Sequence, residues 1–266
     1  MTVSERTQPT LLGEVRYILR ALAVTFGPFV LAGCIAFLSV VGLRELSVPL
    51  ADRMGDMWSP LLSVAGTPYW VQPVTLRPAA MIGLKPLPLA GAVGMWTVSV
   101  VAVTVASGLV FQSLDRDTQT LVPPVDRVFW LVAYAVGLAV ALGALEPLLR
   151  GVTLPVVLGT LALVVVLARL FVTPVTIVRD GRGPFEAIRW SNDAVGAASA
   201  TPAMVLGVVG FALAYRLMIL FAGFLFSAET TVLVSLVLGT ALVGTVHAGT
   251  MVWAYGKVES YASTDR

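Results

Sequence analysis

Residues 154–178 read LPVVLGTLALVVVLARLFVTPVTIV, and their only charged residue is Arg169. An α-helix needs about 20 apolar residues to cross the hydrocarbon of a bilayer. Five further stretches qualify, so the predicted spans are 21–43, 89–112, 128–149, 154–178, 202–226 and 231–256. Because a lipid-embedded segment must satisfy its own backbone hydrogen bonds, these spans are predicted to be helices. The predicted fold class is all-α: one integral membrane domain over 1–266, a polytopic bundle of six transmembrane helices with short interfacial helices.

The composition of the chain agrees with this division. Of its 266 residues, 58% are hydrophobic and 12% are charged, whereas soluble chains carry roughly 25% charged residues. The six predicted spans contain three charged residues, Glu146, Arg169 and Arg216. A soluble globule is therefore excluded. The net charge of +2 gives no reason to expect a nucleic-acid partner.

The distribution of Lys and Arg predicts the orientation. An even number of spans puts both termini on one side, and ten basic residues lie on that side against five on the other. The positive-inside rule then predicts that both termini are cytoplasmic, in a multi-pass protein of the cell (plasma) membrane. Segment 44–88 would be external, and its seven prolines exclude a continuous helix through it. It is interpreted either as a cap over a cleft or as a loop packed on the bundle.

A cytoplasmic segment between the fourth and fifth spans shows a local helix pattern. Residues 180–183, Asp-Gly-Arg-Gly, indicate a tight turn, and Pro184 suits the first position of a new helix. Apolar residues recur on one face of the following stretch. They are Phe185, Ile188 and Val195. We predict a short amphipathic helix over 184–196 that lies along the inner membrane surface.

The same region carries a longer motif, P-x-x-I-V-x-D-G-x-x-x-x-E-A-hydrophobic-x-x-S. Its residues are Pro174, Ile177, Val178, Asp180, Gly181, Gly183, Glu186, Ala187, Ile188 and Ser191. The motif resembles an element of a broad group of poorly characterised prokaryotic six-span membrane proteins. That group includes proteins similar to the membrane domain attached to some glycerophosphodiester phosphodiesterases. The resemblance implies a fold without an established molecular function. Phosphodiesterase activity does not follow, because the chain has one histidine and no cluster of acidic metal ligands.

Ionisable residues within the spans are the candidates for ligand binding, since a charge at mid-bilayer costs about 2.5–3.5 kcal/mol. Arg216 lies deep in the fifth span and Arg169 in the fourth. Our hypothesis is that they line a polar cavity that accepts an anion or a lipid headgroup, with His247 as a further candidate. The alternative is that the arginines hold helices together through backbone carbonyls and that His247 makes a structural hydrogen bond.

Three small residues at four-residue spacing follow one face of the sixth span. They are Thr240, Gly244 and Ala248. Small residues let helix backbones approach closely in lipid, so this face is predicted to pack against another helix. Packing within the chain and packing in a homo-oligomer are both open.

No catalytic motif was found, and no catalytic residue, cofactor or metal site is predicted. The single cysteine and single histidine give no metal-ligand set. The predicted function is a non-catalytic membrane protein that organises lipids or protein partners. The alternative is a transporter or permease for a small anionic or lipid-like solute, which the deep arginines favour. The expected partners are membrane lipids, with further copies of the chain or other membrane proteins left open.

Overall fold

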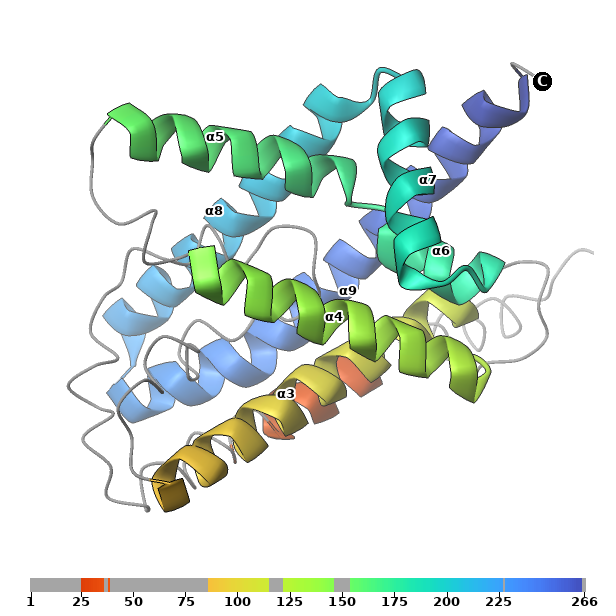
Figure 1. The fold of residues 1–266 in the computed structure, drawn as a ribbon. Helices are drawn as coiled ribbons and strands as arrows, with labels where there is room; N and C mark the ends of the chain where they lie inside the picture. The colour runs from red at the N-terminus through yellow and green to blue at the C-terminus, as the bar shows by residue number, and fades with distance from the viewer. Residues whose placement is uncertain are drawn as a thin grey trace, which may run out of the picture.

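The computed structural model describes residues 25–35, 38, 86–114, 122–145, 154–226 and 228–264. The backbone in these ranges is helical apart from short connections (Figure 1). Four helices are long and apolar enough to cross a membrane, and a fifth span results if one bent helix pair counts as one. The predicted all-α helical bundle is thus confirmed. The predicted external segment 44–88 lies outside the described residues, except for its last three positions.

Figure 1 labels the helices of the described ranges from α3 onward. They are α3 (Pro86–Ser113), α4 (Val125–Leu145), α5 (Leu154–Arg169), α6 (Thr173–Asp180), α7 (Pro184–Ala197), α8 (Thr201–Leu225) and α9 (Ala228–Thr264). A shorter apolar helix, Thr25–Ile35, precedes them and is called the N-terminal helix below. The second, third, fifth and sixth predicted spans correspond to α3, α4, α8 and α9.

The fourth predicted span, 154–178, is found as the apolar stretch Leu154–Asp180, which is long enough to cross a membrane, but its helix is interrupted. Helix α5 ends at Arg169, a turn follows over 170–172, and α6 begins at Thr173. Pro174 supplies the physical reason, because proline has no N–H to donate to the carbonyl four residues before it. The N–H of Thr173 instead donates to the carbonyl of Leu170 at 3.1 Å, which tightens the turn. Pro174 then occupies the start of α6, where a missing N–H has no consequence.

Helix α6 is enclosed by the rest of the bundle. All its residues from Thr173 to Val178 are buried, and it contacts α3, α4, α7 and α9. Helices α5 and α9 both pack against α8. The interrupted fourth span therefore places its second half in the centre of the packed helices.

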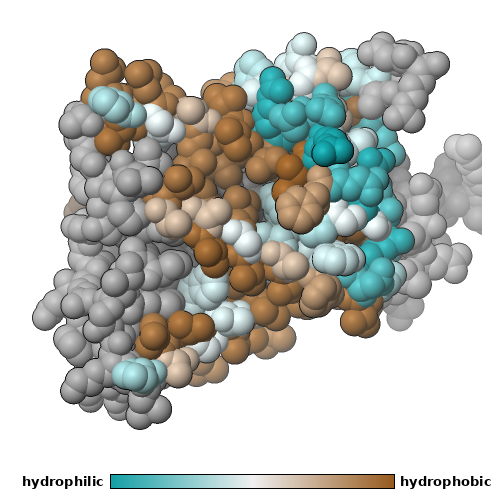
Figure 2. All heavy atoms as spheres, viewed as in Figure 1, coloured by the Kyte–Doolittle hydropathy of each residue, from teal (hydrophilic) through white to brown (hydrophobic). Residues whose placement is uncertain are grey.

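Helix α7 has nearly the bounds predicted for the interfacial helix, and it begins at Pro184. In Figure 1 it stands across the end of the bundle to which the C-terminal part of α9 runs, and it makes an angle of 113° with α8. Figure 2 shows hydrophilic residues gathered at this end and hydrophobic residues over the helices away from it. We call this end the α7 end. It consists of α7, the α6–α7 connection and the facing ends of α3, α4 and α9.

Candidate functional site

The motif residues form the connection between α6 and α7. Gly181 follows the last residue of α6 and adopts a left-handed conformation with φ 69°. A Cβ atom at this position would also lie 3.2 Å from Nε of Arg127. Gly183 is extended and leads into Pro184. Glycine at 181 is thus required twice, for its backbone conformation and for the space that the guanidinium group occupies.

Arg127 binds the end of α6. It lies in the first turn of α4, and its Nη1 donates to the carbonyl oxygens of Val178 at 2.7 Å and Arg179 at 2.9 Å. The last four carbonyls of a helix have no partner within it. A cation at this position also interacts favourably with the negative end of the helix dipole. Arg127 therefore caps α6 from a different helix.

Two other helix ends receive a side chain in the same way. Ser191 of α7 donates its hydroxyl to the carbonyl of Arg169, the last residue of α5, at 2.7 Å. Arg179 of α6 directs its Nε to the carbonyl of Phe111, near the end of α3, at 3.5 Å. We call Arg127, Arg179 and Ser191 the cross-helix caps. Together they connect the C-terminal ends of three helices to their neighbours.

A tyrosine of α9 completes the α7 end. The Tyr255 hydroxyl lies 2.6 Å from Oδ1 of Asp180 and 3.3 Å from Oε1 of Glu259, and it donates to the nearer oxygen. The other oxygen of Asp180 pairs with Nε of Arg182 at 3.2 Å. The guanidinium of Arg182 stacks over the ring of Trp190 at 5.1 Å. These contacts join α6, α7 and α9.

Arg169, predicted to line a cavity, faces α7. Its Nη1 is 3.5 Å from Oδ1 of Asn192, and a Cβ atom at Gly196 would lie 3.1 Å from the same nitrogen. The interruption of the fourth span explains this placement, because α5 ends at Arg169 and brings it level with α7. The half-buried arginine therefore sits at the α7 end and contributes to helix packing there.

Of the other two predicted ligand residues, the structure describes the side chain of His247 but not that of Arg216. His247 is buried, with its ring centroid 5.4 Å from that of Phe171 and 4.8 Å from that of Phe211. It thus packs against the turn between α5 and α6. Arg216 belongs to α8, but its side chain lies outside the described part of the structure. The proposed cavity with Arg216 stays a prediction.

The small-residue stripe of α9 packs within the chain. Thr240, Gly244 and Ala248 are all buried. A Cβ atom at Gly244 would lie only 2.8 Å from Cδ1 of Phe29 in the N-terminal helix. The neighbouring Thr245 also donates its hydroxyl to the carbonyl of Thr25 at 3.2 Å. Glycine at 244 therefore permits the close approach of the N-terminal helix to α9.

The contacts of the α7 end were only partly foreseeable. Ser191 belongs to the motif, but Arg127 and Tyr255 were not singled out, because no local pattern relates them to residues more than fifty positions away.

Among the described residues, no group of three or more His, Cys, Asp or Glu side chains could hold a metal ion.

The fold and the α7 end define a class, an all-α bundle whose long apolar helices are those of a multi-pass membrane protein. A scan against protein-family models, a search of curated proteins and a search of solved structures each found no match. The resemblance to the membrane domains attached to phosphodiesterases therefore stays a prediction from the motif residues and the layout of the spans.

Proposed function

We propose that this chain is a non-catalytic integral membrane protein of the plasma membrane that organises lipids or protein partners at the cytoplasmic surface. The observation that carries the proposal is the attachment of α7. One face of this helix is fixed to the bundle, while the other is presented at the hydrophilic end of the molecule (Figure 2). An amphipathic helix held in this way suits a membrane interface or a partner surface.

The two faces of α7 differ clearly. Its buried residues are Ala187, Ser191, Ala194 and Val195. Its exposed residues include Phe185, which is 88% exposed, together with Glu186, Arg189 and Asp193. An exposed aromatic side chain beside charges of both signs is typical of a contact surface at headgroup depth. The exposed face is thus available for binding without rearrangement of the bundle.

The use of the motif side chains supports a non-catalytic role. Ser191 binds a backbone carbonyl, Asp180 binds Tyr255 and Arg182, and Gly181 makes room for Arg127. These groups hold helices together. The motif therefore supports the architecture of the α7 end, and the exposed face of α7 supports the interaction.

The proposal is tested by identifying the lipids and proteins that co-purify with the full chain in mild detergent. The triple variant Phe185→Ser, Arg189→Ser and Asp193→Ser should lose the partners that the wild type retains. Its melting should change little, since exposed substitutions usually alter stability by less than about 0.5 kcal/mol. Lys257→Ser with Tyr261→Ser, at exposed positions of α9, is the matched control. An unchanged set of partners in the triple variant would contradict the proposal.

The orientation has its own test. In a Cys34→Ser background, Thr2→Cys should react with a membrane-impermeant thiol reagent only in inside-out vesicles, and Gln72→Cys only in right-side-out cells. Reaction of Thr2→Cys from outside would overturn the cytoplasmic assignment of the termini.

A second candidate, a transporter or permease for a small anionic or lipid-like solute, is favoured by the interruption of the fourth span. Discontinuous helices frequently form the substrate sites of transporters, and here Arg169 directly precedes the turn at 170–172. We expect Arg216→Leu to abolish uptake of such a solute into vesicles if this function holds. Full expression, unchanged melting and unchanged lipid co-purification in Arg216→Leu would end the cavity hypothesis.

A further inference from the structure

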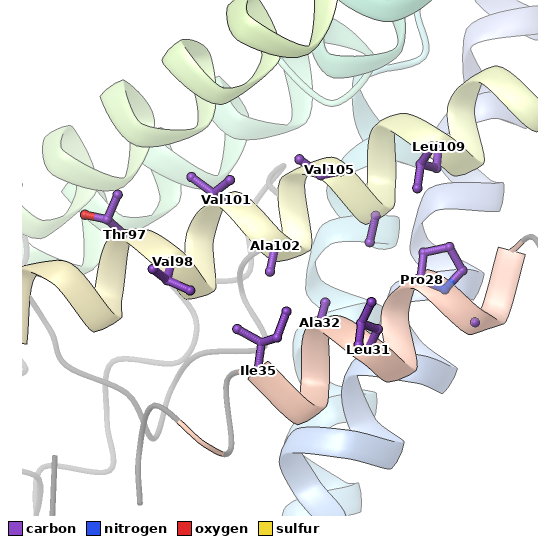
Figure 3. Close-up of a pocket in the computed structure, with 12 residues that line it drawn as sticks. Pro28, Leu31, Ala32, Ile35, Thr97, Val98, Val101, Ala102, Val105 and Leu109 are labelled. Atoms are coloured by element: carbon purple, nitrogen blue, oxygen red, sulfur yellow. The ribbon is translucent and has the colours of Figure 1, made fainter. Parts of the chain in front are cut away.

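A groove separates the N-terminal helix from α3. Its volume is about 600 Å³, within the 300–1,000 Å³ typical of ligand pockets. Figure 3 shows Leu31 and Ile35 on the N-terminal helix and Val98 and Ala102 on α3 directed into the space between the two helices. The N-terminal helix is held from its other side, where the fully buried Phe29 packs on Gly244 of α9. The groove therefore belongs to the packed bundle.

The lining of the groove is apolar with one exception. The exception, Thr97, donates its hydroxyl to the carbonyl of Val93 at 2.8 Å within its own helix. Small side chains form the floor, since Ala32 and Ala106 are almost completely buried. Larger residues stand at the rim, where Leu31 is 64% exposed and Val98 is 53% exposed. Among the described residues, the groove thus offers depth and an opening but no free polar group for a hydrophilic ligand.

The groove has the length of one membrane leaflet. Its lining on α3 runs from Thr97 to Leu109, which corresponds to roughly 18 Å at about 1.5 Å per residue. Half of the hydrocarbon core is about 15 Å thick. Leu109 lies one turn before the end of α3, where Arg179 meets Phe111 at the α7 end. In a bilayer whose interface lies at the α7 end, the groove would therefore span the leaflet on the side of α7.

We propose that this groove binds an acyl chain of a membrane phospholipid from the leaflet on the α7 side. The apolar side chains that line the groove offer water no hydrogen-bonding partner, and acyl chains are the apolar medium that surrounds a spanning helix. The lipid headgroup would lie beyond Leu109 and Pro28. This inference rests on the proposed function in one respect, the embedding of the bundle in a bilayer, and it adds a specific lipid site distinct from the exposed face of α7.

The test uses the full chain in phospholipid vesicles that contain a phosphatidylethanolamine with a photoactivatable group in its acyl chain. After irradiation, lipid adducts are mapped by mass spectrometry. We expect adducts on residues 97–109 to exceed those around Leu161 of α5 about tenfold, equivalent to about 1.4 kcal/mol of preferential binding. Leu161 is a fair reference because it is 58% exposed on an equally apolar helix.

Filling the groove should remove this excess. Ala102→Trp is expected to reduce the adducts on α3 to the level seen on α5, whereas Val140→Trp, at a 53% exposed position of α4, should leave them unchanged. Ala106→Leu provides a second, smaller filling if Ala102→Trp does not fold. Equal labelling of α3 and α5 in the wild type, or an excess that survives both fillings, would overturn the proposal.

Two other occupants give different results in a companion experiment. A photo-crosslinking amino acid in place of Val98 should yield a lipid adduct. A crosslink to residues 39–85 of the same chain, or to a second copy, would overturn the proposal in favour of a groove covered by protein. If the triple variant of α7 loses its partners but still shows lipid labelling in the groove, the groove site is independent of the function proposed for the exposed face of α7.

Discussion

The α7 end and the contact between the N-terminal helix and α9 hold helices together by different means. At the α7 end, directional polar contacts connect helix termini, as when Arg127 donates to two carbonyls at the end of α6. At the other contact, the ring of Phe29 packs against Gly244, and the approach is set by the absence of a side chain. The first contact adjoins the hydrophilic surface (Figure 2), and the second lies between buried residues of two apolar helices.

The difference follows from the two surroundings. Near water, a helix end has carbonyls without partners, and a charged side chain can reach them while part of it stays hydrated. Within lipid no hydrophobic force draws helices together, so close packing of small residues becomes the main source of association. Charged residues of the motif therefore belong to the α7 end, and substitutions should affect the two contacts by different mechanisms.

The largest effect is expected for Arg127→Met, which removes the cap of α6 and leaves two carbonyls unpaired. Hydrogen bonds to charged groups contribute about 1.5–3 kcal/mol each, so we expect a loss of about 3 kcal/mol. The apparent melting temperature in detergent should fall by roughly 6–12 °C. Arg189→Met, an exposed position on α7, is the control and should change the melting temperature by little. Equal melting of the two variants would show that the cap is not structural.

Gly244→Leu is expected to have the next largest effect and probes the second contact. The ring of Phe29 occupies the space that the new side chain needs, and overpacking typically costs about 1–3 kcal/mol. Gly137→Leu on α4 is the matched control, since a Cβ atom there meets nothing within 4 Å. Thermal melting should show destabilisation in Gly244→Leu, while Gly137→Leu should be neutral or slightly stabilising because leucine has the higher helix propensity. The opposite order would contradict the close approach of the N-terminal helix.

The sequence predicted the parts of this architecture that depend on local pattern. The apolar runs located the long helices, and the turn before Pro184 located the start of α7. The division of the fourth span was missed, although Pro174 was present, because lipid-embedded helices often tolerate proline. Arg127 and Tyr255 were missed for another reason. Their partners in other helices are more than fifty residues away, and such contacts are set by helix packing.

Ser191→Ala should have an intermediate effect at the α7 end. It removes the hydroxyl that donates to the carbonyl of Arg169 at 2.7 Å, next to the interruption of the fourth span. An unsatisfied buried carbonyl costs about 1–3 kcal/mol, and for this part-buried carbonyl we expect a loss near 1.5 kcal/mol. Ser260→Ala is the control, because Ser260 makes a bond of the same length at an exposed position where water can replace it. In detergent, Ser191→Ala should have a lower melting temperature than Ser260→Ala. The reverse order would exclude a stabilising cap of α5 by Ser191.

The smallest expected effect is that of Tyr255→Phe. The substitution keeps the ring that packs against Trp190 at 5.5 Å and under Arg179 at 5.6 Å, and it removes only the hydroxyl bound to Asp180. Asp180 retains its ion pair with Arg182.

A loss of about 1 kcal/mol is therefore expected for Tyr255→Phe, against no measurable change for Tyr261→Phe, whose residue is 60% exposed. A double-mutant cycle with Asp180→Ala, which removes the acceptor, isolates the hydroxyl–carboxylate contact, and its coupling energy should also be about 1 kcal/mol. A coupling energy of zero would mean that α9 is held at the α7 end by ring packing alone. In that case shape alone would hold α9 at both of the contacts compared above, and the cross-helix caps of α3, α5 and α6 would distinguish the α7 end.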